Sequence, residues 1–322
     1  MQLLVSGAIQ GEDGHQGVLA ALLILDGLTG EILHRAEYHP PDELVSEGQK
    51  IQFTGSCFIN GVYYVCSHNE ILVFEEWPPD KPARRITING FNDLHHCFPY
   101  KDGLAVSNTG LETVDYVSLD GELIERWDLL AGVEGARVID PDKDYRLIPD
   151  TKPHLRHGNH VFTLDGELWT SQLSTSDAAC ATDTSKTLEM EVGMPHDGIV
   201  MGGKLVFTTT NGHLVFFDLE APHAREAVHL TELNPDFSQL GWCRGVCEVP
   251  GSPGEYFVMF SALRRSKWKD FGYWIKYKHG MPKSHLGRYD IANKKYVSAV
   301  EIGEGVGYQL FQIDPLPEER WV

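Results

Sequence analysis

Histidine is the residue type in this sequence with the clearest potential for chemistry. Five histidines stand where short apolar runs begin: His95, His96, His157, His160 and His196. Neutral imidazole is a common ligand of zinc, copper and iron, and three converging imidazoles leave a coordination position open for a substrate. The pattern predicts a divalent transition metal, Fe, Zn, Cu or Mn, held by several of these histidines. Alternatively, they hydrogen-bond neighbouring strands to each other, since no spacing here is as specific as an HExxH motif.

Two charged residues at similar places could act on a substrate. Arg244 follows Trp242 and Cys243 where other parts of the chain place histidine. A guanidinium there would bind a carboxylate, sulfate or phosphate through its paired N–H donors, and a structural ion pair is the alternative. Asp197, next to His196, could orient that imidazole or act as a general base, or it could instead cap the turn at Gly198. We predict Asp197 and Arg244 as catalytic residues, with Arg244 also binding substrate.

The segment 262–285 is basic and aromatic in an otherwise acidic chain. Interleaved cations and rings hold anionic or aromatic ligands by stacking and cation–π contact. We predict that this insertion is a substrate-binding flap in which Trp268, Tyr273 and Trp274 contact the ligand. An extended structural hairpin or an oligomer contact is the alternative.

The elements that would bring these residues together are short strands in a recurring order. Apolar runs rich in Val, Ile, Leu, Phe and Tyr alternate with Asp-Gly, Asn-Gly and Gly-Gly pairs, which is typical of strands joined by tight turns. One pattern repeats along the chain: an apolar strand, a tight turn, a second strand that often ends in Ser or Thr, and two further strands. Its copies open near Phe53, His95, His157, His196 and Trp242.

The two chain ends complete one further copy, with 307–313 as its inner strand and 2–7, 18–25 and 31–38 as the others. We therefore predict an all-β fold, a six-bladed β-propeller closed by N- and C-terminal strands in one blade, with residues 1–322 as a single domain. Circular stacking covers the edges and faces that an isolated blade would expose. A five-bladed ring with a loose C-terminus is the alternative.

The copy from His95 to Leu129 has an Asp-Gly turn, a serine after its second strand and another Asp-Gly before its fourth. In this it resembles blades of the broad propeller superfamily that includes the arylsulfotransferases, the SMP-30-like lactonases and the NHL repeats. The resemblance covers most of the chain as a blade pattern and implies the fold. It identifies no single family, and a fold does not by itself determine chemistry.

Inner strands of a propeller line an axial channel, so residues that open these strands should meet near the axis. The long insertions fall on the face where the inner strands begin, and we expect the site at that mouth. The alignment of the repeat copies leaves two possibilities that differ by one residue. Counting back from Ser107 and Thr208 gives His95 and His196 equivalent positions, whereas counting back from the turn glycines makes His96 equivalent to His196. Side chains alternate along a strand, so only one of two adjacent histidines would face the channel. We choose His96, His157 and His196 as metal ligands, with His95 and His160 as alternates.

The net charge and the lengths of the apolar stretches exclude some classes of binding partner. A formal charge of −19 argues against generic binding to nucleic acid or anionic membranes. The longest apolar stretch, 18–25, is far shorter than the ~20 residues of a membrane helix. Residues 1–10 do not have the pattern of a signal peptide, and six cysteines imply no disulfide framework, so we expect a cytoplasmic protein with a small-molecule substrate.

Three functions follow from these patterns. The first is a metal-dependent hydrolase, lyase or oxygenase that acts on a small anionic or aromatic substrate at the mouth of the axial channel. The second is a non-catalytic propeller that binds a protein or carbohydrate through its loop-rich face. The third is a metal-free enzyme in which a channel histidine is the general acid or base.

Overall fold

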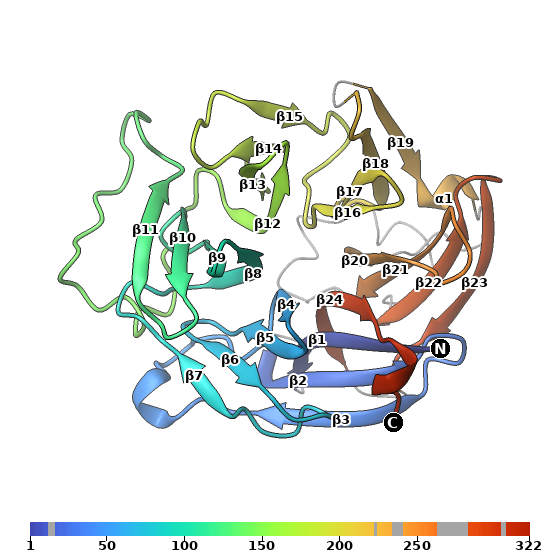
Figure 1. Cartoon of the computed structure of the whole chain (residues 1–322), viewed down its shortest axis with the longest axis horizontal. Coiled ribbons are helices and arrows are strands. Elements are labelled where there is room, and N and C mark those ends of the chain that lie inside the picture. The colour runs from blue at the N-terminus through green and yellow to red at the C-terminus, as the bar shows by residue number, and fades with distance from the viewer. Residues whose placement is uncertain (12–16, 222–223, 234–240, 263–282, 304–306) are drawn as a thin grey trace.

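The computed structural model describes residues 1–11, 17–221, 224–233, 241–262, 283–303 and 307–322. Within these residues the strands form six four-stranded antiparallel sheets. Figure 1 shows the sheets as blades around one axis. The repeat therefore predicted the six-bladed β-propeller correctly, and the five-bladed alternative is wrong.

The blades are numbered here from the one that contains both chain ends, and each is given from its innermost strand outward. Blade 1 comprises β24 (Tyr308–Pro315), β1 (Gln2–Gln10), β2 (Gly17–Asp26) and β3 (Ile32–Tyr38). Blade 2 comprises β4 (Ser56–Ile59), β5 (Val62–Cys66), β6 (Ile71–Phe74) and β7 (Arg84–Ile86). Blade 3 comprises β8 (Leu94–Tyr100), β9 (Gly103–Asn108), β10 (Thr113–Ser118) and β11 (Leu123–Asp128).

Blade 4 comprises β12 (Gly158–Leu164), β13 (Glu167–Gln172), β14 (Asp177–Cys180) and β15 (Thr187–Glu189). Blade 5 comprises β16 (Ile199–Met201), β17 (Lys204–Thr208), β18 (His213–Asp218) and β19 (Arg225–His229). Blade 6 comprises β20 (Trp242–Glu248), β21 (Glu255–Ser261), β22 (His285–Asp290) and β23 (Lys295–Glu301). The described helical elements are short: η1 (Asp42–Leu44), α1 (Leu230–Leu233) and η3 (Glu318–Arg320). Among the described residues, no helix has the length and hydropathy to cross a membrane.

The ring closes in blade 1, where the C-terminal strand β24 pairs antiparallel with the N-terminal strand β1. Beyond the strands, the Gln2 side chain exchanges two hydrogen bonds with the backbone of Val322, at 2.8 and 2.9 Å. Figure 1 accordingly shows the two termini close together beside β24 and β1. Closure removes the open edge and unburied face that an incomplete ring would present.

The blades are held together by apolar side chains that alternate along each strand. Tyr63 of β5 packs with Leu22 on the side of blade 1, whereas its neighbour Tyr64 packs with Val106 on the side of blade 3. Each interface between consecutive blades in the described structure has one such hydrophobic cluster. Because successive side chains point to opposite faces of a sheet, a run of apolar residues in a middle strand serves both neighbouring blades.

Several inner strands carry a β-bulge at the same level of the ring. The pairing register shifts between Leu94 and His96 in β8, between Gly158 and Val161 in β12, and between Cys243 and Val246 in β20. A bulge places two residues opposite one and re-aims their side chains. The one-residue ambiguity in the histidine register comes from this shift, because His95 is the extra residue of the bulge in β8.

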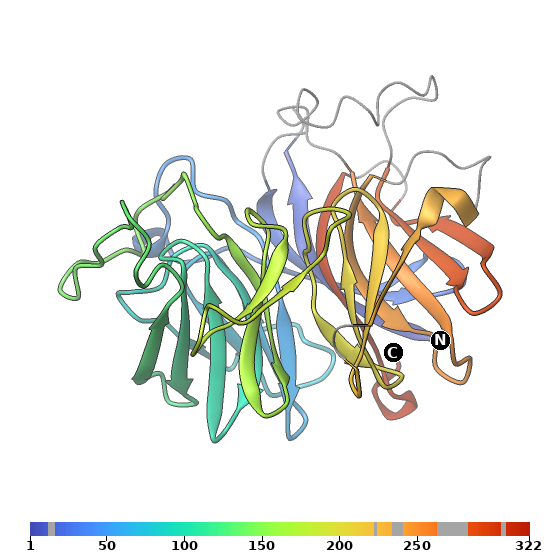
Figure 2. The ribbon, with the colours of Figure 1, turned by 90° about the horizontal axis from the view of Figure 1, so that it is seen from above.

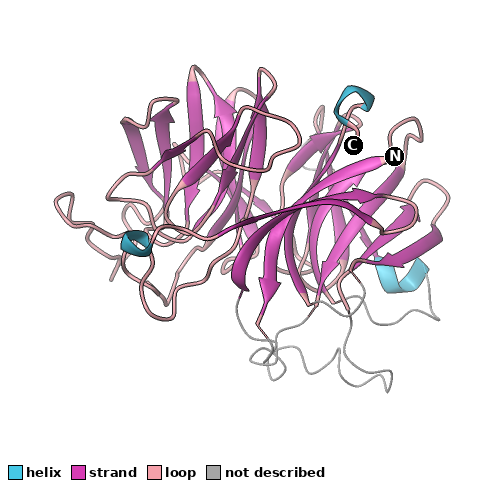
Figure 3. Ribbon diagram, turned by 90° about the horizontal axis from the view of Figure 1, so that it is seen from below, coloured by secondary structure: helices cyan, strands magenta, loops and turns pink. Residues whose placement is uncertain are grey.

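The strands run between the two faces of the ring, as the side view in Figure 2 shows. Figure 3 shows that the helical elements lie at the margins of the strand framework. The centre of the molecule is therefore lined by the inner strands and their bulges.

Candidate functional site

A cavity of about 550 Å³ lies between the inner strands of blades 1 to 5. Its inner end is polar, with Ser56, His96, His160, Gln312 and Asp314. Its other end is lined mostly by apolar side chains close to the ends of β8, β12 and β16, including Leu164, Val200 and Leu219. The cavity thus extends toward the face where the inner strands end, not toward the face where the sequence places the site.

Two histidines of neighbouring blades form one wall of this cavity. The rings of His96 and His160 stack, with centroids 3.5 Å apart and planes 19° from parallel. The N–H of Val161 donates a hydrogen bond of 3.2 Å to Nδ1 of His96. Burial lowers the pKa of His160 to about 4 and that of His96 well below its usual range. Both imidazoles are therefore neutral at physiological pH.

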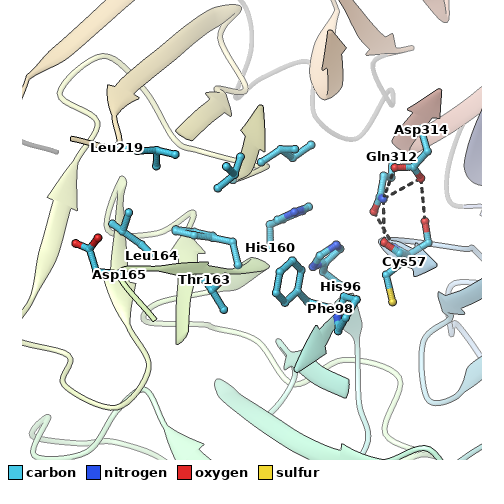
Figure 4. Close-up of a pocket in the computed structure, with 16 residues that line it drawn as sticks. Cys57, His96, Phe98, His160, Thr163, Leu164, Asp165, Leu219, Gln312 and Asp314 are labelled. Atoms are coloured by element: carbon cyan, nitrogen blue, oxygen red, sulfur yellow. Dashed lines mark hydrogen bonds between the residues drawn. The ribbon is translucent and has the colours of Figure 1, made fainter. Parts of the chain in front are cut away.

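Asp314 faces these histidines from the other side of the cavity (Figure 4). Nε2 of Gln312 donates to both carboxyl oxygens at 3.1 and 3.0 Å, and the hydroxyl of Ser56 donates to Oδ2 at 3.4 Å. Gln312 is itself held by the N–H of Ser56, which donates to Oε1 at 2.7 Å. Asp314 is partly exposed, but desolvation of its carboxyl group outweighs these hydrogen bonds and raises its pKa from 3.8 to about 6.

His196 and Asp197 form a hydrogen-bonded pair where blade 5 begins. Nδ1 of His196 lies 3.0 Å from Oδ1 of Asp197, and Oδ2 accepts hydrogen bonds from the Thr208 hydroxyl and the Gly245 N–H. Burial alone would raise the pKa of Asp197, but these donors lower it. Asp197 thus orients His196 and ties blade 5 to blade 6. It does not cap a turn at Gly198.

A second group of histidines lies where β8 and β12 begin. The rings of His95 and His157 meet edge to face at 5.1 Å, and Nδ1 of His157 lies 2.9 Å from Nδ1 of His154. Nδ1 of His95 donates to the carbonyl of Asp93 at 2.8 Å. Burial lowers the pKa of His95 to about 3 and that of His157 well below its usual range.

Arg244 lies beside this central region at the bulge of β20. Its guanidinium carbon is 4.2 Å from the ring centre of Phe311 and 4.8 Å from that of Trp242. Its charge also contributes to lowering the pKa of His196, after the larger effect of burial. Cation–π contacts therefore hold Arg244 in place. One of its two aromatic partners, Phe311, directly precedes Gln312, which lines the cavity.

Comparisons with known proteins bear on the fold. No protein-family model matches the sequence, and no curated protein matches it either. A solved protein of unknown function from Bacteroides caccae superposes with a TM-score of 0.62 at 13% identity, over 97% of both chains. A chain of a nidogen/laminin complex superposes with 0.57 at 10% identity, also over 97% of both chains. The Cps50 (Swd1) β-propeller domain of Myceliophteria thermophila gives 0.50 at 11% identity, over 94% of this chain and 89% of that one.

The likeness is one of fold alone. At these identities, the functions of the similar structures do not transfer to this chain. The chemistry of this propeller must come from its own side chains.

The predicted metal ligands do not converge as a single donor set. The rings of His96 and His160 stack 3.5 Å apart and are nearly parallel. A metal ion binds an imidazole nitrogen in the plane of its ring, at about 2 Å. An ion in the plane of one ring therefore lies too far from the plane of the other, so the two histidines cannot both bind one ion. Over the described ranges, no group of three or more His, Cys, Asp or Glu side chains has an arrangement that could hold a metal. The metal centre stays a prediction.

The sequence interpretation missed Asp314 and Gln312. They alternate with apolar residues along β24, so they share the face that lines the cavity. That alternation was visible, but the predicted inner strand ended one residue before Asp314. The predicted ligand contacts Trp268, Tyr273 and Trp274 lie outside the described residues.

Proposed function

We propose that this protein is an enzyme that moves protons on a small carbonyl compound with an apolar or aromatic portion, bound in the axial cavity. One observation carries the proposal: a desolvated carboxyl group with a raised pKa and a neutral imidazole line opposite sides of the same cavity. Pairs of titratable groups whose surroundings push them away from their ordinary pKa values are typical of acid–base sites.

The shape and lining of the cavity support a ligand of this class. Its volume of about 550 Å³ lies within the range of about 300–1,000 Å³ that small-molecule sites occupy. The apolar side chains near the strand ends suit the hydrocarbon part of the ligand. The polar end, with Ser56, Gln312, Asp314 and His160, suits a carbonyl group.

The chemistry follows from the two protonation states. Above pH 6, Asp314 is mainly a carboxylate and can accept a proton from the carbon next to the carbonyl group. The electron pair of that C–H bond moves onto the carbonyl oxygen, where a neutral His160 can donate an N–H hydrogen bond. Asp314 then returns the proton, either to another carbon or to a departing group. Isomerisation or elimination is the expected reaction class.

The proposal is tested with a panel of metabolite-sized ketones, esters and lactones, aromatic and aliphatic, incubated with the protein in D₂O. NMR follows binding, exchange of the C–H protons and conversion. We expect exchange in the wild-type protein and none in Val200→Trp, which places a bulky ring at the cavity end where Val200 is 48% exposed. Val297→Trp, at a 38% exposed residue of the outer strand β23, is the matched control and should behave as wild type.

Other outcomes would favour the other functions. Exchange that requires added Fe, Zn, Cu or Mn would support the metal-dependent enzyme predicted from the histidines. Tight binding without exchange across the panel would support a non-catalytic propeller. Binding that is equally strong in Val200→Trp and wild type would contradict the axial cavity as the site.

A further inference from the structure

Three buried thiols meet between blades 2 and 3. Sγ of Cys57 in β4 lies 3.9 Å from Sγ of Cys97 in β8. Cys66 of β5 belongs to the same buried cluster as Cys57 and Cys97. Cys57 lines the cavity at the edge of its polar end, as Figure 4 shows, whereas Cys66 and Cys97 are fully buried. One thiol of the three is thus reachable from the cavity, and the other two lie behind it.

The backbones of the two blades approach unusually closely at this point. The N–H of Gly55 donates to the carbonyl of His95 at 2.7 Å. A Cβ atom at Gly55 would stand only 2.8 Å from Cα of His96, so no larger residue fits without a shift of the backbone. Cys57 follows Gly55 by two residues and Cys97 follows His96 directly. This close approach holds the two sulfur atoms 3.9 Å apart, and they must come to about 2.05 Å for a disulfide to form.

We propose that Cys57 and Cys97 form a reversible oxidation site for hydroperoxides that enter the axial cavity. As the Cys57 sulfur attacks one oxygen of the hydroperoxide and the O–O bond breaks, the Cys97 thiolate takes the Cys57 thiol proton. Cys97 passes this proton to the departing oxygen, which leaves as water or an alcohol, and Cys97 is again a thiolate. Cys57 becomes a sulfenic acid, oxidised by two electrons, while the hydroperoxide is reduced. The Cys97 thiolate then attacks the Cys57 sulfur, a disulfide forms, and the released hydroxide takes a proton from solvent.

The surroundings of Cys97 suit the second step. The protonated Cys97 thiol donates to the carbonyl of Tyr64 at 3.6 Å, and burial opposes its ionisation, but interactions with the thiols of Cys57 and Cys66 lower its pKa to about 5. Burial raises the pKa of Cys57 well above its ordinary value, so the Cys97 thiolate must accept the Cys57 proton as the first step begins. This inference uses the cavity as an access route and does not depend on the proposed proton-transfer activity.

The experiment treats the whole protein with hydrogen peroxide, alkylates the remaining thiols after denaturation, and analyses an unreduced digest by mass spectrometry. The expected result is a cross-linked pair of peptides containing Cys57 and Cys97, reversed by dithiothreitol. It should form at least about tenfold faster than oxidation of the buried thiols of Cys180 and Cys247. Cys97→Ser lacks both the proton acceptor and the second thiol, so Cys57 should oxidise more slowly, and the sulfenic acid that does form should be trapped by dimedone.

Cys247→Ser is the matched control, because this buried thiol packs between blades 6 and 1 and should leave the cross-link unchanged. Three results would overturn the inference. They are a Cys57 that stays alkylatable after peroxide treatment, a disulfide between Cys57 and Cys66, and oxidation of all six free cysteines at one rate. Each is read from the wild-type protein, so the test does not depend on any variant folding.

Discussion

The ring of His96 stacks on the ring of His160 at 3.5 Å and receives a hydrogen bond from the N–H of Val161 at 3.2 Å. One histidine therefore joins blade 3 to blade 4 and supports the imidazole that lines the cavity. The hydrogen bonding between blades that the sequence offered as the alternative to metal binding is thus present at His96, whose ring also lies against the cavity-lining His160.

Substitution of His96 should separate these roles. His96→Phe leaves the buried Val161 N–H without its acceptor, and the free energy of unfolding should fall by about 1–3 kcal/mol. His96→Asn keeps an acceptor near the position of Nδ1 and should lose less. Urea unfolding of the three proteins measures the difference. Equal losses in both variants would show that the hydrogen bond contributes nothing.

Loss of the carboxyl group should remove proton transfer but not binding. Asp314→Asn keeps the size of the side chain, and the rate of C–H exchange should drop about 10²- to 10⁴-fold, which is the usual contribution of a general base. Affinity for the same ligand should stay within a few-fold of wild type. Asp120→Asn, in the exposed turn between β10 and β11, is the matched control. An exchange rate equal to wild type in Asp314→Asn would remove this residue from the mechanism.

Stability should fall as the pH drops below 6.5. The unfolded chain protonates its histidines near that value, whereas burial lowers the folded pKa of His160 to about 4 and that of His95 to about 3. The unfolded state therefore binds more protons in this window, and stability is full above pH 6.5 and is lost progressively toward pH 4. Asp314 acts in the opposite direction between 3.8 and about 6, because its folded form keeps the proton longer.

The free energy of unfolding, measured in urea from pH 4 to 8, tests this balance. His160→Gln should flatten the curve below pH 6.5, and Asp314→Asn should steepen it. A wild-type curve with no slope in this window would contradict the burial of neutral histidines.

Asp197 should matter for folding. Its two oxygens accept hydrogen bonds from Thr208 and Gly245 and pair with His196, and Asp197→Asn would turn an amide NH₂ toward donors. Burial lowers the pKa of His196, so Asp197 accepts hydrogen bonds from neutral donors, and leaving one such buried donor unsatisfied costs about 1–3 kcal/mol. Asp183→Asn, at an exposed turn aspartate, should leave the unfolding transition little changed. Similar melting temperatures for Asp197→Asn and wild type would show that the pair adds no stability.

Much of the blade framework could be predicted because tight turns and alternating apolar residues are local signals. The sequence predicts an inner strand from His95 to Tyr100 followed by an Asp-Gly turn, and the structure has β8 there, from Leu94 to Tyr100. The site was harder to predict because it depends on bulges, which shift the register of His95 and His96 without a local sequence signal. Asp314 became visible as a site residue only when the last strand was placed against Ser56 of blade 2.

The most direct test of the proposed acid–base site needs no substrate. Protein labelled with ¹³C at the aspartate carboxyl carbons is titrated by NMR from pH 3 to 8, and Asp314→Asn assigns the signal. We predict that Asp314 titrates with a midpoint near 6, because desolvation of its carboxyl group disfavours the charged form. A midpoint at or below 4 would mean that the carboxyl group is solvated, and it would contradict Asp314 as a desolvated base.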